Sequence, residues 1–427
     1  MLSKNWLKSM GVLCTLLIVT EVKAQTSSST YSALGIGEFN YSGLTQNQGM
    51  GGMGISYGTG WQANNVNPAI TTRNTIFNFQ AALNYKRINV DNGTETSKVD
   101  GGGLSYVAMS FPIKSGKFTS GMGLGQITSV NYRLRVDSEV ANSDFHANNY
   151  LRGDGGISEA YINFGYLLAK NLSIGAHGSY LFGSTIRTNQ LLITDEEGFS
   201  VGNASEYYER LTVSDVGFKL GAHYMVKVSE KGNLHLGAIY QKLGEVNGTG
   251  FAKLAGIDQA SNPDSDGDLI ANDEPGNIYI PDRIGFGLTY EKMNKFALAL
   301  EGQFQDFTKY QNFFGDELDL HEAKKVALGF QIVPNYLSFD NLLMRGTYRI
   351  GLEWMQTPYY LNQTSINDIG LTLGASIPVN QLSLINFAFK AGQRGTLDNG
   401  LIKENYINFT LGFSLNDNSW FYKRVFE

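Results

Sequence analysis

One short motif in the sequence has the spacing of a catalytic serine. Residues 54–58 are Gly-Ile-Ser-Tyr-Gly, which matches the G-x-S-x-G pattern of a nucleophile elbow. That chemistry requires a sharp strand-to-helix turn in an α/β sheet, and the sequence around residue 56 predicts no such turn. The histidines form no metal-ligand spacing such as H-E-x-x-H; they are His146, His177, His223, His235 and His321. We therefore expect that the protein is not an enzyme.

Acidic and amide side chains alternate along residues 262–274, which are Asn-Pro-Asp-Ser-Asp-Gly-Asp-Leu-Ile-Ala-Asn-Asp-Glu. Carboxylates at every second position, with a glycine for the turn, can place oxygen ligands around a hard cation. The pattern resembles a thrombospondin type-3 calcium repeat in a single copy. The sequence leaves open either an acidic turn exposed to water or a calcium site with the ligands Asp264, Asp266, Asp268 and Asn272. No other cofactor is expected.

The first residues predict export. Two lysines precede an apolar stretch at residues 11–20, and residues 22–24 (Val-Lys-Ala) fit a signal-peptide cleavage site. We expect residues 1–24 to be a signal peptide; the alternative, a membrane anchor, is opposed by a stretch too short to span a bilayer. The single cysteine, Cys14, lies in this stretch, so the exported chain would have no disulfide and no thiolate.

Apolar and polar residues alternate with a period of two through most of the remaining chain. Residues 406–416, 369–377 and 284–290 each have one face of large apolar residues and another of glycine and small polar residues. Apolar faces on nearly every segment suit a lipid-facing band, and glycine-rich faces suit a crowded lumen. We count fourteen such segments, an even number as in bacterial barrels. The fold class is therefore predicted as all-β, a fourteen-stranded antiparallel transmembrane β-barrel over residues 75–416 in the outer membrane.

Connection lengths indicate the orientation. Short connections are expected near residues 114, 170, 230, 293, 337 and 380, and longer ones at 137–155, 194–206, 248–280 and 308–320. Short turns face the periplasm in this class of barrel, so both termini would be periplasmic, including a tail at residues 417–427.

Charged residues make up only 17% of the chain, its net charge is −6 and it has no basic run, so no nucleic-acid partner is expected.

Residues 25–74 do not fit the strand pattern. They include the glycine-rich stretch 49–60, which can turn sharply and lie close to other backbone. A barrel of this size has a lumen that can be filled, so we expect these residues to form an N-terminal hatch, or plug, inside it. A disordered periplasmic arm is the alternative, but the methionine and aromatic content argues against it.

A family resemblance follows from this segment. The run Ser42-Gly43-Leu44, the glycine-rich stretch and then Asn67-Pro68-Ala69 resemble the hatch of the FadL/TodX family of outer-membrane transporters for hydrophobic compounds. Residues 281–290 also resemble a strand of that family. The resemblance implies passive uptake of a hydrophobic small molecule such as a long-chain fatty acid, with lateral release into outer-membrane lipid. It also implies that the hatch gates the path, with Asn67, Pro68 and Ala69 as hatch and gate residues.

Lateral release requires a weak place in the wall. Glycine inside a strand often marks a bulge or bend, and we expect either a lateral opening or room for the hatch at Gly121, Gly123 and Gly125. A second function also fits the resemblance, because barrels of the FadL fold serve as accessory proteins of the type 9 secretion system. The chain would then have a secretion-system partner and need not transport a ligand.

Overall fold

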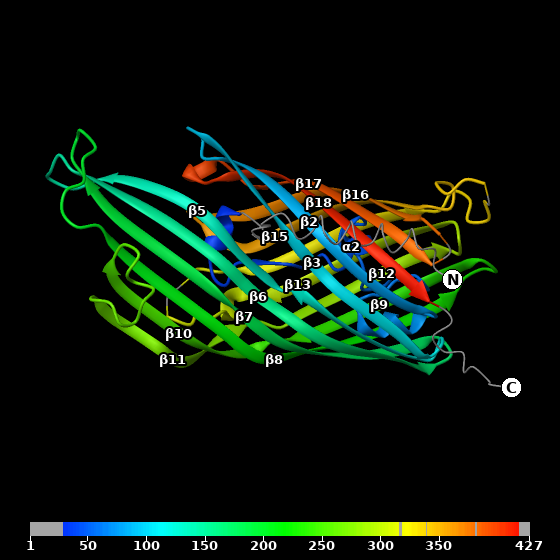
Figure 1. The fold of residues 1–427 in the computed structure, drawn as a ribbon. Helices are drawn as coiled ribbons and strands as arrows, with labels where there is room; N and C mark the ends of the chain where they lie inside the picture. Colours follow the sequence, from blue (N-terminus) through cyan, green and yellow to red (C-terminus); the bar gives the residue numbers. More distant parts are fainter. Residues whose placement is uncertain (1–28, 316–317, 339, 381, 418–427) are drawn as a thin grey trace, which may run out of the picture.

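The computed structural model describes residues 29–315, 318–338, 340–380 and 382–417. Within this part of the chain, fourteen antiparallel strands form a closed barrel, because the last strand pairs with the first (Figure 1). Three of the fourteen are interrupted once, as β4/β5, β9/β10 and β11/β12. The predicted fold class and strand number are confirmed. The barrel segments are β2 (Phe77–Asp91), β3 (Thr96–Lys114), β4 (Phe118–Gln126), β5 (Thr128–Glu139), β6 (His146–Ala169), β7 (Leu172–Thr194), β8 (Ser205–Lys227), β9 (Gly232–Lys242), β10 (Gly244–Gly256), β11 (Asp268–Ile280), β12 (Arg283–Lys292), β13 (Phe296–Asp306), β14 (Glu322–Ile332), β15 (Thr347–Leu361), β16 (Thr364–Pro378), β17 (Ser383–Gly395) and β18 (Lys403–Asp417).

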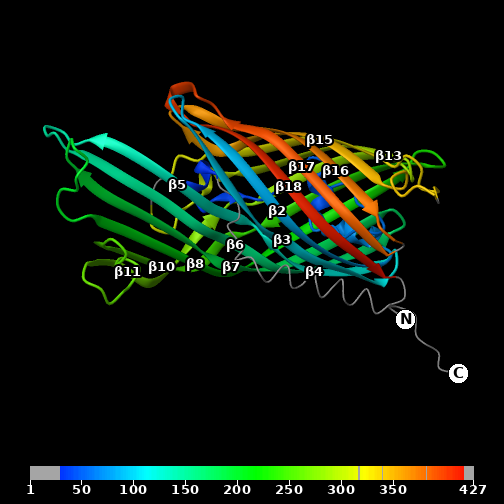
Figure 2. The ribbon, with the colours of Figure 1, turned by 45° about the horizontal axis from the view of Figure 1, so that its top comes forward.

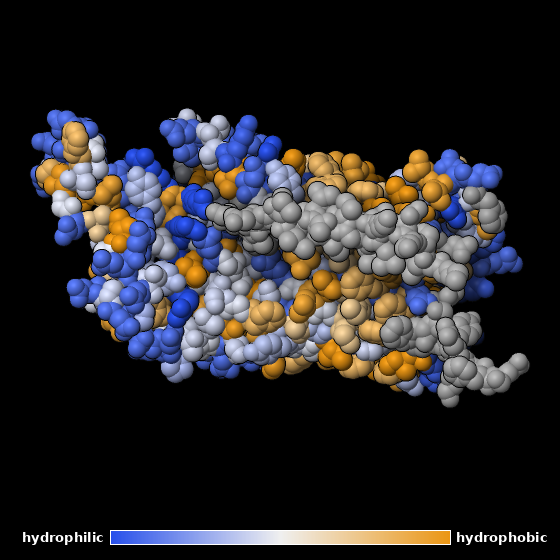
Figure 3. Space-filling view, viewed as in Figure 1, coloured by the Kyte–Doolittle hydropathy of each residue, from blue (hydrophilic) through white to orange (hydrophobic). Residues whose placement is uncertain are grey.

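The outer surface of the barrel is apolar and its inner surface is polar. On β18, Phe409 and Leu411 are about two-fifths exposed on the outside, whereas Thr410 and Ser414 are buried on the inside. The same alternation recurs along the other strands and gives an apolar band around the wall, orange in Figure 3. A soluble β-protein buries its apolar face, so this arrangement is the one that lipid requires. Among the described residues, no helix is long and apolar enough to cross a membrane.

The two ends of the barrel differ in shape. We call the end where β2 begins and β18 finishes the turn end, and the opposite one the loop end. At the loop end, β5 to β8, β10 and β11 extend beyond the other strands and form a one-sided wall (Figure 1). The predicted extents of the connections at 137–155 and 248–280 are therefore wrong, because most of these residues are strand. Nearly all of residues 133–139 in β5 and 268–277 in β11 are exposed whichever way they point, so these parts lack the alternation that identified the other strands.

Residues 29–76, which we call the inner segment, lie within the barrel, drawn in blue in Figures 1 and 2. Its short elements are η1 (Thr30–Ala33), β1 (Glu38–Phe39), α2 (Thr45–Gln48) and η2 (Pro68–Arg73); η3 (Phe307–Lys309) and η4 (Asp398–Gly400) belong to loop-end connections. A Cβ atom added to Gly237 of β9 would overlap the carbonyl oxygen of Ile55, so the inner segment approaches the wall as closely as glycine permits. The predicted signal peptide and the residues after Asp417 lie outside the described part of the chain.

Candidate functional site

The barrel wall is broken between β3 and β5, and we call this interruption the wall break. The ladder between β3 and β4 ends at the pair Tyr106 and Gly125. Beyond it, β3 pairs only with β2, and β5 pairs with β6, so β5 diverges from β3 toward the loop end (Figure 2). Ile127 stands at the interruption, and its carbonyl oxygen accepts a hydrogen bond of 2.8 Å from the backbone N–H of Asn40. The inner segment thus continues the sheet at the wall break, where β1 pairs with the start of β5.

The three glycines predicted to form a lateral opening differ in their surroundings. Gly121 and Gly123 pair regularly with both β3 and β6. An added Cβ on Gly123 would lie 2.5 Å from the carbonyl oxygen of Val107, whereas one on Gly125 would meet nothing within 4 Å. Gly125 therefore borders the wall break, and the other two lie inside an intact ladder. Lateral opening itself stays a prediction.

A cluster of apolar side chains connects the loop end to the wall break. Phe313 and Phe314, from the connection after β13, pack at one side of this apolar cluster, and Ile127 packs at another. The cluster also contains Ile36 and Phe39 of the inner segment and inward residues of the barrel strands. The remaining members are Ile157, Leu181, Leu211, Val213, Leu243, Val246, Ile278, Ile280 and Tyr310. Apolar side chains of the protein therefore form one packed cluster that includes both the connection after β13 and Ile127 at the wall break.

A small cavity of about 70 Å³ lies where the apolar cluster meets the wall break. Phe39, Ile127 and Leu243 contribute to its lining, and so do the charged residues Lys219, Arg283 and Glu159. The ammonium of Lys219 donates a hydrogen bond of 2.8 Å to the carbonyl oxygen of Asn65. The guanidinium of Arg283 lies over the ring of Tyr41, at 5.0 Å from its centre. Apolar and charged side chains thus meet at the wall break.

The G-x-S-x-G motif of the inner segment binds a carboxylate of the wall. Glu301 on β13 accepts hydrogen bonds from the backbone N–H groups of Gly54 at 3.0 Å, and of Ile55 and Ser56 at 2.8 Å. Successive N–H groups that converge in this way form an anion-binding nest. The hydroxyl of Ser56 lies 2.7 Å from that of Thr289. No strand-to-helix elbow surrounds Ser56, so the motif serves to attach the inner segment to the wall.

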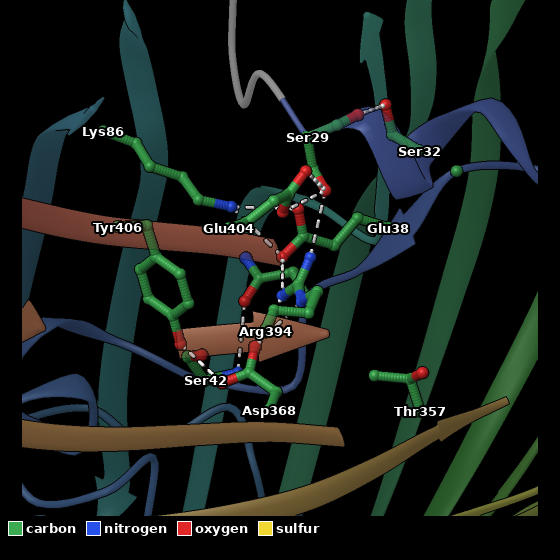
Figure 4. Close-up of polar contacts among 12 residues, drawn as sticks. Ser29, Ser32, Glu38, Ser42, Lys86, Thr357, Asp368, Arg394, Glu404 and Tyr406 are labelled. Carbon is green, nitrogen blue, oxygen red and sulfur yellow. Dashed lines mark hydrogen bonds and ion pairs between the residues drawn. The ribbon is translucent and has the colours of Figure 1, made fainter. Parts of the chain in front are cut away.

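A charged network attaches the start of the inner segment to β16, β17 and β18 (Figure 4). The guanidinium of Arg394 donates hydrogen bonds of 2.6 Å to Glu38 and 2.7 Å to Asp368, and Lys86 binds Glu38 at 2.9 Å. Burial alone would raise the pKa of Glu38, but Arg394 and Lys86 outweigh it and hold that pKa well below its ordinary value. Glu404 accepts hydrogen bonds from Ser29 and Thr30. The ionised carboxylate of Glu38 therefore links the inner segment to the barrel wall.

Sequence reasoning identified part of the polar lumen and missed this network. It predicted that one polar face of each alternating segment lines the lumen, and the burial of Glu301 and Lys325 agrees with that prediction. It did not single out Asp368 or Arg394. Both are charged residues on the glycine-rich face of an alternating strand, and that position is the signal which would have found them.

Asn67, Pro68 and Ala69 lie where the inner segment crosses beneath β8. The side chain of Asn67 accepts a hydrogen bond of 3.0 Å from the backbone N–H of Ala69. Asn67 thereby caps the N-terminus of η2. It donates to the carbonyl oxygen of Ile55 at 2.6 Å and to that of Ala222 at 3.1 Å. Asn67 thus joins two stretches of the inner segment to the wall. A role of these residues in gating stays a prediction.

The residues predicted to bind calcium are spread along an exposed connection. Asp264 and Asp266 lie in the turn before β11, whereas Asp268 and Asn272 belong to β11. In the described part of the chain, no group of three or more His, Cys, Asp or Glu residues could hold a metal ion. The buried ammonium of Lys253 instead donates hydrogen bonds to the carbonyl oxygens of Asn262 at 2.9 Å and of Pro263 at 3.2 Å. Calcium binding stays a prediction.

Comparison with known proteins places the fold. A family model described as BamG matches residues 6–427. A Pseudomonas aeruginosa FadL homologue has 14% identity and a TM-score of 0.58, over 89% of this chain and 99% of its own. The Pseudomonas putida toluene transporter TodX has 15% identity and a TM-score of 0.55, over 90% and 99%. The Ralstonia pickettii toluene transporter TbuX has 13% identity and a TM-score of 0.55, over 88% and 99%. No curated protein matches the chain. At these identities the solved structures show a shared fold.

Proposed function

We propose that this chain, which belongs to the BamG family, is an outer-membrane barrel for passive passage of hydrophobic compounds. The apolar band around the wall supports the location, and the fold shared with hydrophobic-compound channels supports the class of ligand. With the turn end in the periplasm, the end of β18 at Asp417 lies on that side, as the predicted periplasmic tail requires. The loop end, with its extended one-sided wall, then faces outward.

The observation that carries this proposal is the continuity between the apolar cluster and the wall break. A hydrophobic ligand that entered near Phe313 could exchange contacts with Ile36 and Phe39 and reach Ile127 without crossing a polar layer. The ladder between β3 and the next strand ends beside Ile127, and we propose that the ligand leaves laterally into lipid at this place. The route is filled in this structure, and passage therefore requires a shift of the inner segment.

The charges at the wall break bear on the class of ligand. Arg283 and Lys219 line the small cavity where the apolar cluster ends, with Glu159 as the opposing carboxylate. A long-chain fatty acid combines an apolar tail with an anionic head, and both have complementary groups here. We therefore take a long-chain fatty acid as the first ligand to test.

A reversible cross-link between the inner segment and the wall tests the proposal. The hydroxyls of Ser56 and Thr289 lie 2.7 Å apart, so the double variant Ser56→Cys/Thr289→Cys is designed to form a disulfide. Uptake of a fluorescent long-chain fatty acid by cells that produce this variant should fall under oxidising conditions and recover with a reductant. Ser56→Cys alone is the control and should not respond. Equal uptake by the locked and unlocked barrel would contradict gating by the inner segment.

The alternative function is that of a non-transporting accessory barrel of the type 9 secretion system. The observation that favours it is the dense attachment of the inner segment, which Glu404, Glu38 and Glu301 hold at separate places along its length. A lumen fastened in this way can act as a rigid support for a partner protein. Copurification with a secretion complex, together with fatty-acid uptake equal to that of cells without the barrel, would favour this function over transport.

A further inference from the structure

A second cavity opens at the turn end of the barrel, on the other side of the inner segment from the wall break. Its volume is about 630 Å³, within the range of ligand sites. The turns between β6 and β7, β8 and β9, and β12 and β13 contribute to its lining, together with residues 57–61 and 72–73 of the inner segment. It shares no lining residue with the small cavity at the wall break. We call it the turn-end cavity.

Positive charge is concentrated in the turn-end cavity, although the chain as a whole carries a net charge of −6. Four lysines contribute to the lining: Lys170, Lys227, Lys292 and Lys295. Within the described residues, none of their ammonium groups has a hydrogen bond or an ion pair. Of the two acidic residues in the lining, Glu291 is bound to Arg73 at 3.0 Å and to His235 at 3.0 Å, which leaves Glu230. The cavity therefore has an excess of uncompensated cations.

The same cavity offers apolar surface. Trp61 of the inner segment is 39% exposed there, and Met225, Met293 and Phe296 also line it. A free inorganic anion would leave this apolar surface exposed to water. A hydrocarbon would leave the four lysines without an opposing charge. A ligand with an acyl chain and an anionic head satisfies both, since the chain covers apolar surface and the head meets ammonium groups.

We propose that the turn-end cavity binds an anionic amphiphile with one acyl chain and a phosphate or carboxylate head. Trp61 and Met225 contact the chain, and the four lysines bind the head. This site is separate from the route through the apolar cluster and does not depend on lateral release. It gives the barrel a ligand at the turn end whether or not the lumen conducts.

Decyl phosphate is the probe for this site. The full barrel in a neutral maltoside detergent is titrated with decyl phosphate while the emission of Trp61 is followed, and Trp61→Phe identifies the signal of that residue. The variant Lys170→Gln/Lys227→Gln/Lys292→Gln/Lys295→Gln should bind about tenfold more weakly or worse, because each lysine near an anionic head adds to the attraction. The matched control is Lys114→Gln/Lys117→Gln/Lys231→Gln, which removes turn-end lysines that do not line the cavity. It should bind as the unmodified barrel does.

Three results would overturn the proposal. The quadruple variant could bind decyl phosphate as tightly as the control variant, which would exclude the four lysines. Inorganic phosphate could displace decyl phosphate at equal concentration, which would assign the site to free anions. Decyl maltoside could compete equally with decyl phosphate, which would exclude recognition of the charge. None of these results bears on fatty-acid uptake, so failure here and failure of the proposed transport function are distinguishable.

Discussion

Glu301 on the barrel wall and Ser56 of the inner segment are joined twice: the backbone N–H of Ser56 donates to the carboxylate at 2.8 Å, and its hydroxyl does so at 3.1 Å. Glu301 is buried, and within the described residues none of its hydrogen-bond partners is a cation. Backbone N–H groups thus solvate this carboxylate in place of water. These hydrogen bonds attach the middle of the inner segment to the wall. The first prediction concerns their removal.

Glu301→Gln should loosen residues 54–56. The amide retains one acceptor oxygen but turns an NH₂ group toward backbone donors, so at least one N–H loses its partner, at a cost of about 1–3 kcal/mol. Hydrogen exchange at Gly54, Ile55 and Ser56 should become faster. Glu245→Gln, at an exposed site on β10, is the control and should leave exchange in the inner segment unchanged. Unchanged exchange in Glu301→Gln would show that the nest does not hold the segment.

Gly237→Ala should displace the inner segment from β9. The added Cβ would overlap the carbonyl oxygen of Ile55, and overpacking of this kind costs about 1–3 kcal/mol. Gly178→Ala is the matched control, because a Cβ at that strand position meets nothing within 4 Å. Thermal unfolding should show a lower midpoint for Gly237→Ala alone. Equal midpoints for both variants would mean that the inner segment is not seated as closely as the structure places it.

Arg394→Met should release the start of the inner segment. The substitution leaves Glu38 and Asp368 without a guanidinium in a buried setting, and removal of one partner from a buried ion pair costs about 3–5 kcal/mol. Protease cleavage within residues 29–40 should become faster than in the unmodified barrel. Arg87→Met, which breaks an exposed ion pair with Asp100, is the control and should not change cleavage there.

Acid should weaken the same attachment. The pKa of Glu38 lies well below its ordinary value of 4.5, so its stabilising contribution is complete above about pH 4.5 and is lost as the pH falls through the lower, folded-state value. Hydrogen exchange of residues 30–39 should be constant from pH 7 to 5, after correction for intrinsic rates, and should accelerate in stronger acid. In Glu38→Gln the acceleration should be smaller. Identical acid profiles for the two proteins would remove Glu38 as the titrating group.

Calcium should bind to residues 262–274 if the alternating carboxylates act as ligands. Calorimetry with millimolar Ca²⁺ should then give a signal that Asp264→Asn/Asp266→Asn abolishes. Lys253→Met tests the competing role of the ammonium, which already engages carbonyl oxygens of the same connection. That variant should raise hydrogen exchange in residues 257–267 whether or not calcium binds. Absence of a calorimetric signal with the unmodified barrel would end the calcium hypothesis.

The sequence by itself determined the fold class and the strand number. Successive side chains of a strand point to opposite sides. Lipid on one side and a lumen on the other therefore produce alternating apolar and polar residues, as from Ile407 to Leu415 of β18. The sequence also distinguished residues 25–74 from the barrel strands, because this glycine-rich stretch lacks the alternation of apolar and polar residues. It could not set the ends of β5 and β11, where nearly every side chain is exposed and the alternation disappears.

Only the tertiary structure decided which residues meet in the lumen. Arg394 and Glu38 are more than three hundred positions apart, and no local pattern pairs them. The same holds for Ser56 with Glu301, whose motif alone pointed to a different chemistry, and for the four lysines of the turn-end cavity, which come from three separate turns. Alternation fixes the face on which a side chain lies. Closure of the barrel and the path of the inner segment fix its partners, because these depend on contacts distant in sequence.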